Sequence, residues 1–253
     1  MAQLIVAIDT DETIHPRPTE HPPLTKRVTA TEHHSTCQRC GICCTKGGPA
    51  LHAVDLPLIH EQRLAFADLI TIRKGEPVVS PLVNGIEPSR TELVKVAGRN
   101  DSWSCRFFLG EENGCGIYAH RPQECGLLQC WDPSALTSVI YQACLTRQDI
   151  LPDDEEFTAL IEIQEEHCSF ATVARLAEGL TQEGEDQAIL TELARIITLD
   201  LKIRQRAMQT RGLGLAEELL YFGRPLFKSL SYYHLTILEG PYGVRVIPAS
   251  LGA

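Results

Sequence analysis

The sequence is short of positive charge. Its 253 residues contain 23 Lys and Arg against 33 Asp and Glu, which gives a formal net charge of −10. Proteins that bind nucleic acids neutralise phosphates with a basic surface, and anionic membranes attract basic segments in the same way. We therefore expect neither nucleic acid nor a membrane among its partners.

A long apolar run is also missing. No stretch of about 18 apolar residues occurs, which is the length that a membrane-spanning helix requires. The beginning, MAQLIVAIDTDE, has only a short apolar stretch and no basic residue before it, unlike a secretory signal. These absences predict a cytoplasmic protein. In that reducing compartment, clustered cysteines are typical of metal ligands or redox groups rather than disulfides.

Common catalytic motifs are absent as well. The sequence has no Gly-x4-Gly-Lys phosphate loop, no Gly-x-Gly-x2-Gly fingerprint after a strand, no His-Glu-x2-His and no Gly-x-Ser-x-Gly. It therefore predicts no nucleotide site and no activated nucleophile. Whether the protein is an enzyme stays open.

Cysteines are abundant, and the first group of them reads Cys37-Gln-Arg-Cys40-Gly-Ile-Cys43-Cys44. A Cys-x2-Cys step lets a tight turn bring two sulfurs onto one metal, and Gly41 provides backbone freedom for such a turn. Bacterial ferredoxins begin their cluster motif with the same paired steps, although their continuation is absent here. The pattern predicts that Cys37, Cys40 and Cys43 bind a common metal centre. Neighbouring side chains of an extended backbone point to opposite faces, so Cys43 and Cys44 could serve two different sites.

A second group of cysteines follows between residues 105 and 130. Cys115 lies in a glycine-flanked turn, and Cys125 lies one turn into a helix that Arg121-Pro122 is expected to start. On an uninterrupted helix Cys125 and Cys130 would point about 140° apart, so a common centre requires a bend, for example at Gly126. We expect this group to approach the first one in space. The predicted metal ligands are Cys37, Cys40, Cys43, Cys44, Cys105, Cys115, Cys125 and Cys130.

Two other interpretations of these eight cysteines are weaker. Buried free cysteines are common in protein cores, but several of these cysteines lie in glycine-containing turns. A disulfide framework requires an oxidising compartment, and the sequence offers no export signal. Metal ligation explains the spacing best.

The cysteine motifs resemble a known family. The segments CQRCGICC, WSCRFF, NGCGIY and HRPQECGLLQC are similar to the YkgJ-type cysteine-cluster proteins, which are described as zinc- or iron-chelating, over about residues 36–132. The resemblance implies metal binding through the eight cysteine positions and supplies no agreed reaction. A related cluster in flagellin lysine methylases holds an iron–sulfur cluster, but nothing in the rest of this sequence carries that activity over.

The expected fold class is α+β, in three parts. Residues 1–36 contain a short strand at 3–9 and a proline-rich connector. Residues 37–132 form a loop-rich cysteine-cluster module with a strand at 91–97. Residues 133–253 carry most of the net negative charge and form a mainly helical region with a small sheet.

The helices of this last part are predicted from apolar residues at helical spacing. One helix is expected to extend from Phe157 through Cys168 to Ala171, and another to contain Ile189–Ile203. Gly179 and Gly184 are placed between them. The segment YYHLTIL-EGPYG-VRVIPA predicts two strands around a turn.

Some polar residues are assigned supporting roles. Asp55 is expected to cap a short helix that begins at Leu56–Pro57. The acidic stretch before His167 lacks the Glu-x2-His repeats of a di-iron bundle, so a solvated face is predicted for Glu162, Glu165 and Glu166. Because eight thiolates already fill two four-ligand sites, supporting or surface positions are predicted for His33, His34 and His120.

The remaining cysteines, Cys144 and Cys168, lie in stretches with apolar residues at helical spacing. Neither occurs in a glycine turn, and no other cysteine lies within three residues of either. We predict that they are thiols of helical faces, packed in the core and dispensable for metal binding.

Two functions follow from these patterns. The first is a metal-binding protein that holds an iron–sulfur cluster, with [4Fe–4S] favoured, and that acts with a protein redox partner or as part of a redox or modifying enzyme. The second is a structural zinc protein whose four-thiolate sites hold loops together for partner binding. The paired Cys-x2-Cys steps favour iron–sulfur.

Overall fold

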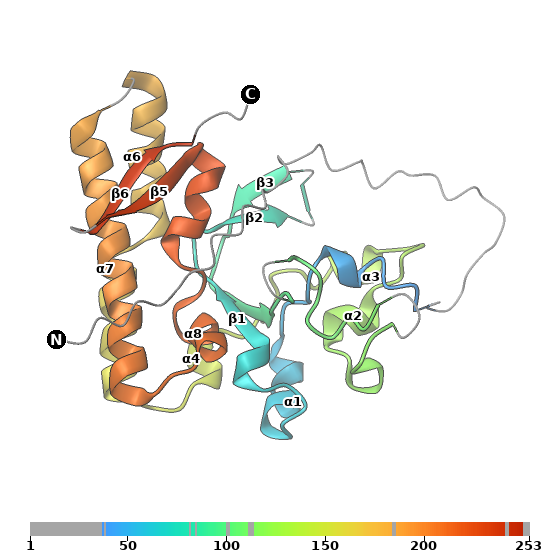
Figure 1. The fold of residues 1–253 in the computed structure, drawn as a ribbon. Coiled ribbons are helices and arrows are strands. Elements are labelled where there is room, and N and C mark those ends of the chain that lie inside the picture. Colours follow the sequence, from blue (N-terminus) through green and yellow to red (C-terminus); the bar gives the residue numbers. More distant parts are fainter. Residues whose placement is uncertain are drawn as a thin grey trace. The chain divides into compact units, whose positions relative to one another are not determined.

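The computed structural model describes residues 37, 39–80, 82–83, 85–99, 102–110, 114–183, 186–240 and 243–249 (Figure 1). Within the part described, the fold is α+β with a mainly helical C-terminal part, as the sequence predicts. The strand predicted at 3–9 and the proline-rich connector lie outside the described residues.

Two short antiparallel ladders follow the first cysteine group. Strand β1 (Leu69–Ile72) pairs with β4 (Leu93–Val96), and β2 (Pro77–Ser80) pairs with β3 (Gly85–Pro88). The strand predicted at 91–97 is β4; the other three were not predicted. All four residues of β1 are buried, because this strand also packs against a C-terminal helix, α8 (Leu215–Phe222) (Figure 1).

Short helices connect these strands to the rest of the cysteine-rich part. They are α1 (Leu56–His60), α2 (Gln123–Leu127), α3 (Ser134–Thr137) and α4 (Arg147–Ile150). Helix α1 begins where the sequence predicts, with proline in its first turn, but Asp55 does not cap it. The carboxylate of Asp55 instead accepts hydrogen bonds from the backbone N–H groups of His52 and Gln123.

Three longer helices form most of the C-terminal part: α5 (Glu155–His167), α6 (Phe170–Glu183) and α7 (Gln187–Arg211). The prediction of a helix that continues to Ala171 is wrong, since α5 ends before Cys168. The carbonyl of Cys168 accepts a hydrogen bond from the Arg73 side chain at 2.9 Å, and Ser169 accepts from the N–H of Thr172 at the start of α6. Gly179 lies inside α6 rather than between helices.

The end of the chain forms the predicted strand pair. Strand β5 (Leu235–Gly240) pairs antiparallel with β6 (Gly243–Pro248), after a 3₁₀ helix at Leu226–Tyr233. This hairpin packs on α7, with β6 against the helix (Figure 1).

The buried apolar residues form two clusters that meet at α8. One cluster fills the helical part and includes Tyr221 and Phe222. The other lies under the cysteine-rich part and includes Leu51, Cys105 and Leu220. Consecutive residues of one helix therefore contribute to both cores, which ties the C-terminal part to the strands that support the cysteines.

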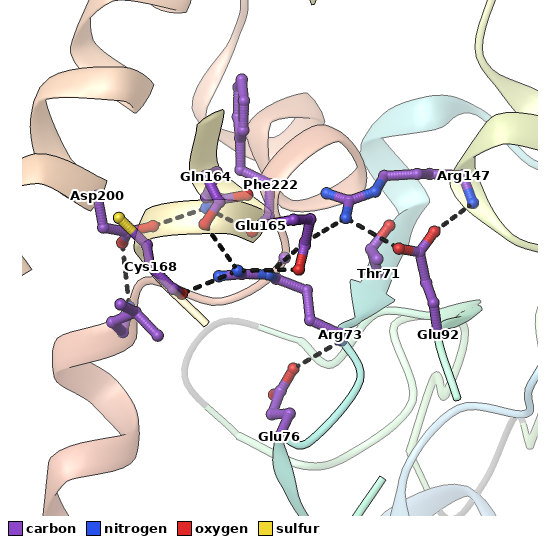
Figure 2. Close-up of polar contacts among 12 residues, drawn as sticks. Thr71, Arg73, Glu76, Glu92, Arg147, Gln164, Glu165, Cys168, Asp200 and Phe222 are labelled. Carbon is purple, nitrogen blue, oxygen red and sulfur yellow. Dashed lines mark hydrogen bonds and ion pairs between the residues drawn. The ribbon is translucent and has the colours of Figure 1, made fainter. Parts of the chain in front are cut away.

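Buried arginines reinforce this junction (Figure 2). Arg73, which has no exposed surface, donates to Glu165 of α5, with 2.7 Å between Nε and Oε1. Arg147 donates to Glu92 at 2.8 Å, to the Tyr221 carbonyl at 2.7 Å, and also to Glu165. Glu165 is thus shared between two guanidinium groups from outside its own helix.

This contact corrects one prediction. Glu165 does not belong to a solvated acidic face, because it neutralises two arginines whose side chains are buried. Burial acts to raise the pKa of Glu165, but the guanidinium groups of Arg73 and Arg147 outweigh burial and hold this pKa below its usual value.

A third buried arginine, Arg204 of α7, binds the turn after α8. Its guanidinium group pairs with Asp200 at 3.0 Å and with Glu218 at 2.7 Å, and it donates to the carbonyl of Phe222 at 2.8 Å. Asp200 also accepts from the side chain of Gln164 at 2.6 Å (Figure 2). All these partners are buried, so each of these charges is compensated by an opposite charge within the core.

Among the helices of the described residues, none is long and apolar enough to cross a membrane.

Replacing Glu165 with glutamine tests the arginine network. We expect Glu165→Gln to lower the free energy of unfolding by about 1.5–3 kcal/mol at pH 7, the range for hydrogen bonds to charged groups. The pKa of Glu165 is lower in the folded protein than in the unfolded chain, where it is about 4.3. The contribution of Glu165 to the free energy of unfolding is therefore fully present above about pH 4.3 and is lost as the pH falls through the folded pKa. Urea unfolding at pH 7 and at decreasing pH measures both effects.

The matched control is Glu192→Gln, which breaks an exposed pair with Arg195 at 2.8 Å on the surface of α7. Exposed pairs contribute little, so a change below about 0.5 kcal/mol is expected. Equal losses in the two variants would contradict a special role for Glu165.

Candidate metal centre

The first cysteine group forms a strained turn. Arg39 has a φ of 55° and Gly41 a φ of 77°, so two of three consecutive residues are left-handed. The N–H of Arg39 donates to the sulfur of Cys37 at 3.4 Å. A hydrogen bond of this kind orients the sulfur and stabilises it as a thiolate ligand. The chain then enters a 3₁₀ helix, Cys44–Lys46.

Close backbone contacts dock this turn on the second cysteine group. A Cβ atom at Gly41 would lie 2.1 Å from the Phe108 ring, and one at Gly114 would lie 3.1 Å from the carbonyl oxygen of Arg39. The N–H of Cys105 donates to the carbonyl of Cys44 at 2.7 Å. These approaches require glycine and place segments more than 60 residues apart in the sequence side by side.

Five thiols consequently lie near one another. We define the inner thiol group as Cys43, Cys44, Cys105, Cys115 and Cys125, because each interacts electrostatically with several of the others. The sulfurs of Cys43 and Cys44 are 4.0 Å apart. Cys37 and Cys40 are exposed, and both interact electrostatically with Cys43.

Burial and mutual repulsion raise the pKa values of four of these thiols, Cys43, Cys44, Cys105 and Cys125. Loss of solvation raises the pKa of Cys44 to about 12, and the neighbouring thiolates of Cys43, Cys105 and Cys115 add to the effect. Loss of solvation also raises the pKa of Cys125, and the neighbouring thiolates of Cys105, Cys43, Cys115 and Cys44 add to this shift. Thiolate charge is therefore costly here unless a cation accompanies it.

Lys95 brings a cationic group to this region. It lies on β4, and its Nζ atom lies 3.6 Å from the position that a Cβ atom would take at Gly47, just after the first cysteine group. Loss of solvation lowers the pKa of Lys95, Arg224 adds to this shift, and Glu124, Glu76 and Cys105 oppose it. A single lysine does not balance the charge of five thiolates.

The structure sets one predicted ligand apart. Helix α2 ends at Leu127, and Cys130 lies beyond it in an exposed turn. The bend between Cys125 and Cys130 comes at Leu128, which is extended, and not at Gly126, which is helical. Within the described residues, no interaction joins Cys130 to another cysteine. His120 is also exposed, and His33 and His34 lie outside the described residues.

The thiols are neighbours rather than a closed coordination sphere. Among the described residues, no three His, Cys, Asp or Glu side chains stand close enough to hold a metal ion without moving. The chemistry of the donors nevertheless fits zinc or iron, because both take thiolate ligands and both supply the positive charge that the desolvated sulfurs lack. Ligation by the eight predicted cysteines stays a prediction.

Sequence reasoning missed three residues beside Cys125. Glu124, which precedes it, accepts from the backbone of Ala50 at 2.8 Å and lies 3.3 Å from the ring of His52. Asp55 completes the group through its bonds to the backbone of His52 and Gln123. No short motif marks such residues, because they come together only in the folded chain.

The two remaining cysteines lie in different surroundings. Cys168 is fully buried in the helical core, as predicted. The prediction of a helical face for Cys144 is wrong: this residue forms an isolated antiparallel bridge with His52. The reason is that residues 143–145 pair with the segment Leu51–Ala53 instead of continuing a helix.

Substitution of the turn glycine should separate the two cysteine groups. In Gly41→Ala the new Cβ collides with Phe108 and the left-handed backbone becomes strained, so we expect a loss of at least about 1–2 kcal/mol and a lower metal content. Gly126→Ala is the control, since nothing lies within 4 Å of its Cβ position and it is helical. There we expect unchanged or slightly increased stability. Urea unfolding and metal per chain decide the comparison.

Cys144 and Cys168 should be dispensable for metal. Cys168→Ala removes a small buried contact and should cost on the order of 1 kcal/mol, with full metal occupancy. Cys144→Ala should also keep its metal. Metal analysis beside thermal unfolding measures this, and loss of stoichiometric metal in either variant would extend the ligand set beyond residue 132.

Comparison with known proteins agrees with the geometry of this region. Residues 36–145 match the family model CxxCxxCC, described as a "putative zinc- or iron-chelating domain". Searches of curated proteins and of solved structures gave no match. The matched stretch contains the first cysteine group, the second group and Cys144. It confirms the resemblance seen in the sequence and supports metal binding. Residues 36–145 of the chain therefore match the CxxCxxCC family of cysteine-cluster domains, the family that the sequence motifs resemble.

Proposed function

We propose that the protein binds an iron–sulfur cluster, with [4Fe–4S] favoured, through its clustered cysteines. The observation that carries this proposal is the inner thiol group, in which five thiols lie near one another beside the turn of Cys37 and Cys40. Burial raises the pKa values of Cys44 and Cys125 within this group. Paired Cys-x2-Cys steps and an N–H bond to a cysteine sulfur are typical of iron–sulfur ligation.

The proposed ligands remain the eight cysteines of the two groups. Cys43 and Cys44 occupy the point where the exposed turn meets the inner thiol group, so two adjacent centres could share the set. We propose that metal binding belongs to residues 37–132 and that the helical tail supplies no ligand. A reducing compartment, which we propose is the cytoplasm, keeps these thiols free for metal.

A bound cluster would supply one-electron transfer. Residues around it would then tune that chemistry: the Arg39 N–H and the Lys95 ammonium both favour negative charge on the sulfurs. The exposed side of Cys37 and Cys40 supports electron exchange with a protein redox partner or a role in a redox or modifying enzyme.

One distance favours a second candidate, a structural zinc site. Two thiolates on one tetrahedral zinc, each bonded at about 2.3 Å, are separated by about 3.8 Å. The sulfurs of Cys43 and Cys44 are 4.0 Å apart, which suits two ligands of a single ion. In this alternative the metal holds the loops together and the domain acts as an interaction module.

Anaerobic purification with metal and sulfide analysis tests both candidates. We expect a brown protein with iron and acid-labile sulfide, and we expect Cys43→Ser and Cys125→Ser each to lower metal content and melting temperature, because metal binding is coupled to folding. Cys168→Ala is the control and should keep its metal. A colourless protein with stoichiometric zinc decides for the second candidate, and unchanged metal and stability in both serine variants would contradict ligation by these groups.

A further inference from the structure

The helix that carries Cys125 has little stability of its own. Helix α2 has five residues, far fewer than an isolated helix needs in water. Its N-cap residue, Pro122, provides no side-chain hydrogen bond to the first turn. The position of Cys125 must therefore come from contacts with other segments.

Asp55 supplies the missing cap from a distant part of the chain. Its Oδ1 atom accepts the N–H of Gln123, the first residue of α2, at 2.8 Å, and its Oδ2 atom accepts the N–H of His52 at 2.9 Å. Asp55 is buried, so water does not compete for these bonds. One carboxylate thus joins the start of α2 to the segment that follows the first cysteine group.

Glu124 makes the reciprocal contact from within α2. Its Oε2 atom accepts the N–H of Ala50 at 2.8 Å, and its Oε1 atom lies 3.3 Å from Nε2 of His52. Both carboxylate oxygens of the residue next to Cys125 are therefore occupied by the segment 50–52.

His52 is held from the other side. It is 2% exposed, and its Nδ1 atom donates to the carbonyl of Gln142 at 2.7 Å, since a carbonyl oxygen only accepts. Hydrogen bonds between Leu51 and Leu145 and between Ala53 and Ala143 flank it, and Leu51 also bonds to β4. The imidazole that faces Glu124 is thus fixed on a rigid strand-like support.

We propose that His52, Asp55 and Glu124 form a clamp that positions the Cys125 thiol to complete the metal site. The three act as positioning residues and bind no metal themselves. This inference rests on the proposed function, because it assigns the clamp a role in ligation. Partners of metal ligands commonly act in this way, and their loss costs about 10- to 100-fold in metal affinity.

Pulsed alkylation of the metal-loaded full chain distinguishes positioning from general stability. Samples loaded with iron and sulfide, or with zinc, are treated briefly with iodoacetamide, and the modified cysteines are identified by mass spectrometry. Cys168, which is 0% exposed in the helical core, reports global unfolding. Cys125 reports the local site.

Glu124→Ala should make Cys125 react while Cys168 stays protected, with a 10- to 100-fold loss of metal affinity. Glu124→Gln should restore protection, because its amide oxygen still accepts from Ala50 and its amide nitrogen can donate to His52. Glu61→Ala is the matched control: its carboxylate is exposed just after α1 and lies outside the clamp, so no change is expected.

If Glu124→Ala unfolds and exposes Cys168, the test uses Asp55→Asn instead. This variant is milder, because asparagine keeps one of the two side-chain oxygens that accept hydrogen bonds from His52 and Gln123. The proposal requires faster alkylation of Cys125 in this variant, and equal rates in Asp55→Asn and the wild type would overturn it. Wild-type metal affinity and a protected Cys125 in a folded Glu124→Ala would overturn the proposal and leave the proposed function intact. A wild type that retains neither iron nor zinc would refute the proposed function and the clamp's role with it.

Discussion

Desolvated thiols at short range are the constraint on which the cysteine-rich part depends. Burial and mutual repulsion raise the pKa values of Cys43, Cys44, Cys105 and Cys125, so these groups bear charge only beside a cation. Glycine contacts and the proposed clamp hold these thiols close together. A bound metal ion would offset the free-energy cost of placing thiolate charges there.

The helical tail contributes by fixing the strands beneath the thiols. Arg73 and Arg147 come from the ends of β1 and α4, and both reach Glu165 of α5, while α8 contributes apolar residues to both cores. Buried charges of this kind add little net stability, but removal of one partner is costly. Their effect is to define one orientation of the strands against the helices. The same junction supports Cys105 and Leu51, which pack in one buried cluster with Leu220 of α8.

Local patterns were sufficient to predict part of this structure. Spacing identified the cysteine groups, apolar periodicity identified α7, and a glycine-containing turn between branched residues identified β5 and β6. Strand β1 was missed because LITI is too short to distinguish from a buried helical segment. The break at Cys168 was missed because the arginine that binds its carbonyl, Arg73, lies 95 residues away in the sequence. Glu165 was assigned to a solvated face for the same reason. Its partners, Arg73 and Arg147, lie in other segments of the sequence and contact it only in the folded chain.

The candidate site shows the same division between local and distant information. Sequence spacing groups Cys37 and Cys40 with Cys43. The fold instead places Cys43 and Cys44 beside thiols of the second cysteine group and leaves Cys130 apart from them. This regrouping arises from the Cys105–Cys44 backbone bond and from the glycine contacts, none of which a motif encodes. Sequence spacing therefore identifies which cysteines are candidate ligands, but it does not show which of them lie together around one metal. Cys43 belongs to the inner thiol group and also interacts electrostatically with Cys37 and Cys40, so it joins the grouping that spacing predicts to the one that the fold produces.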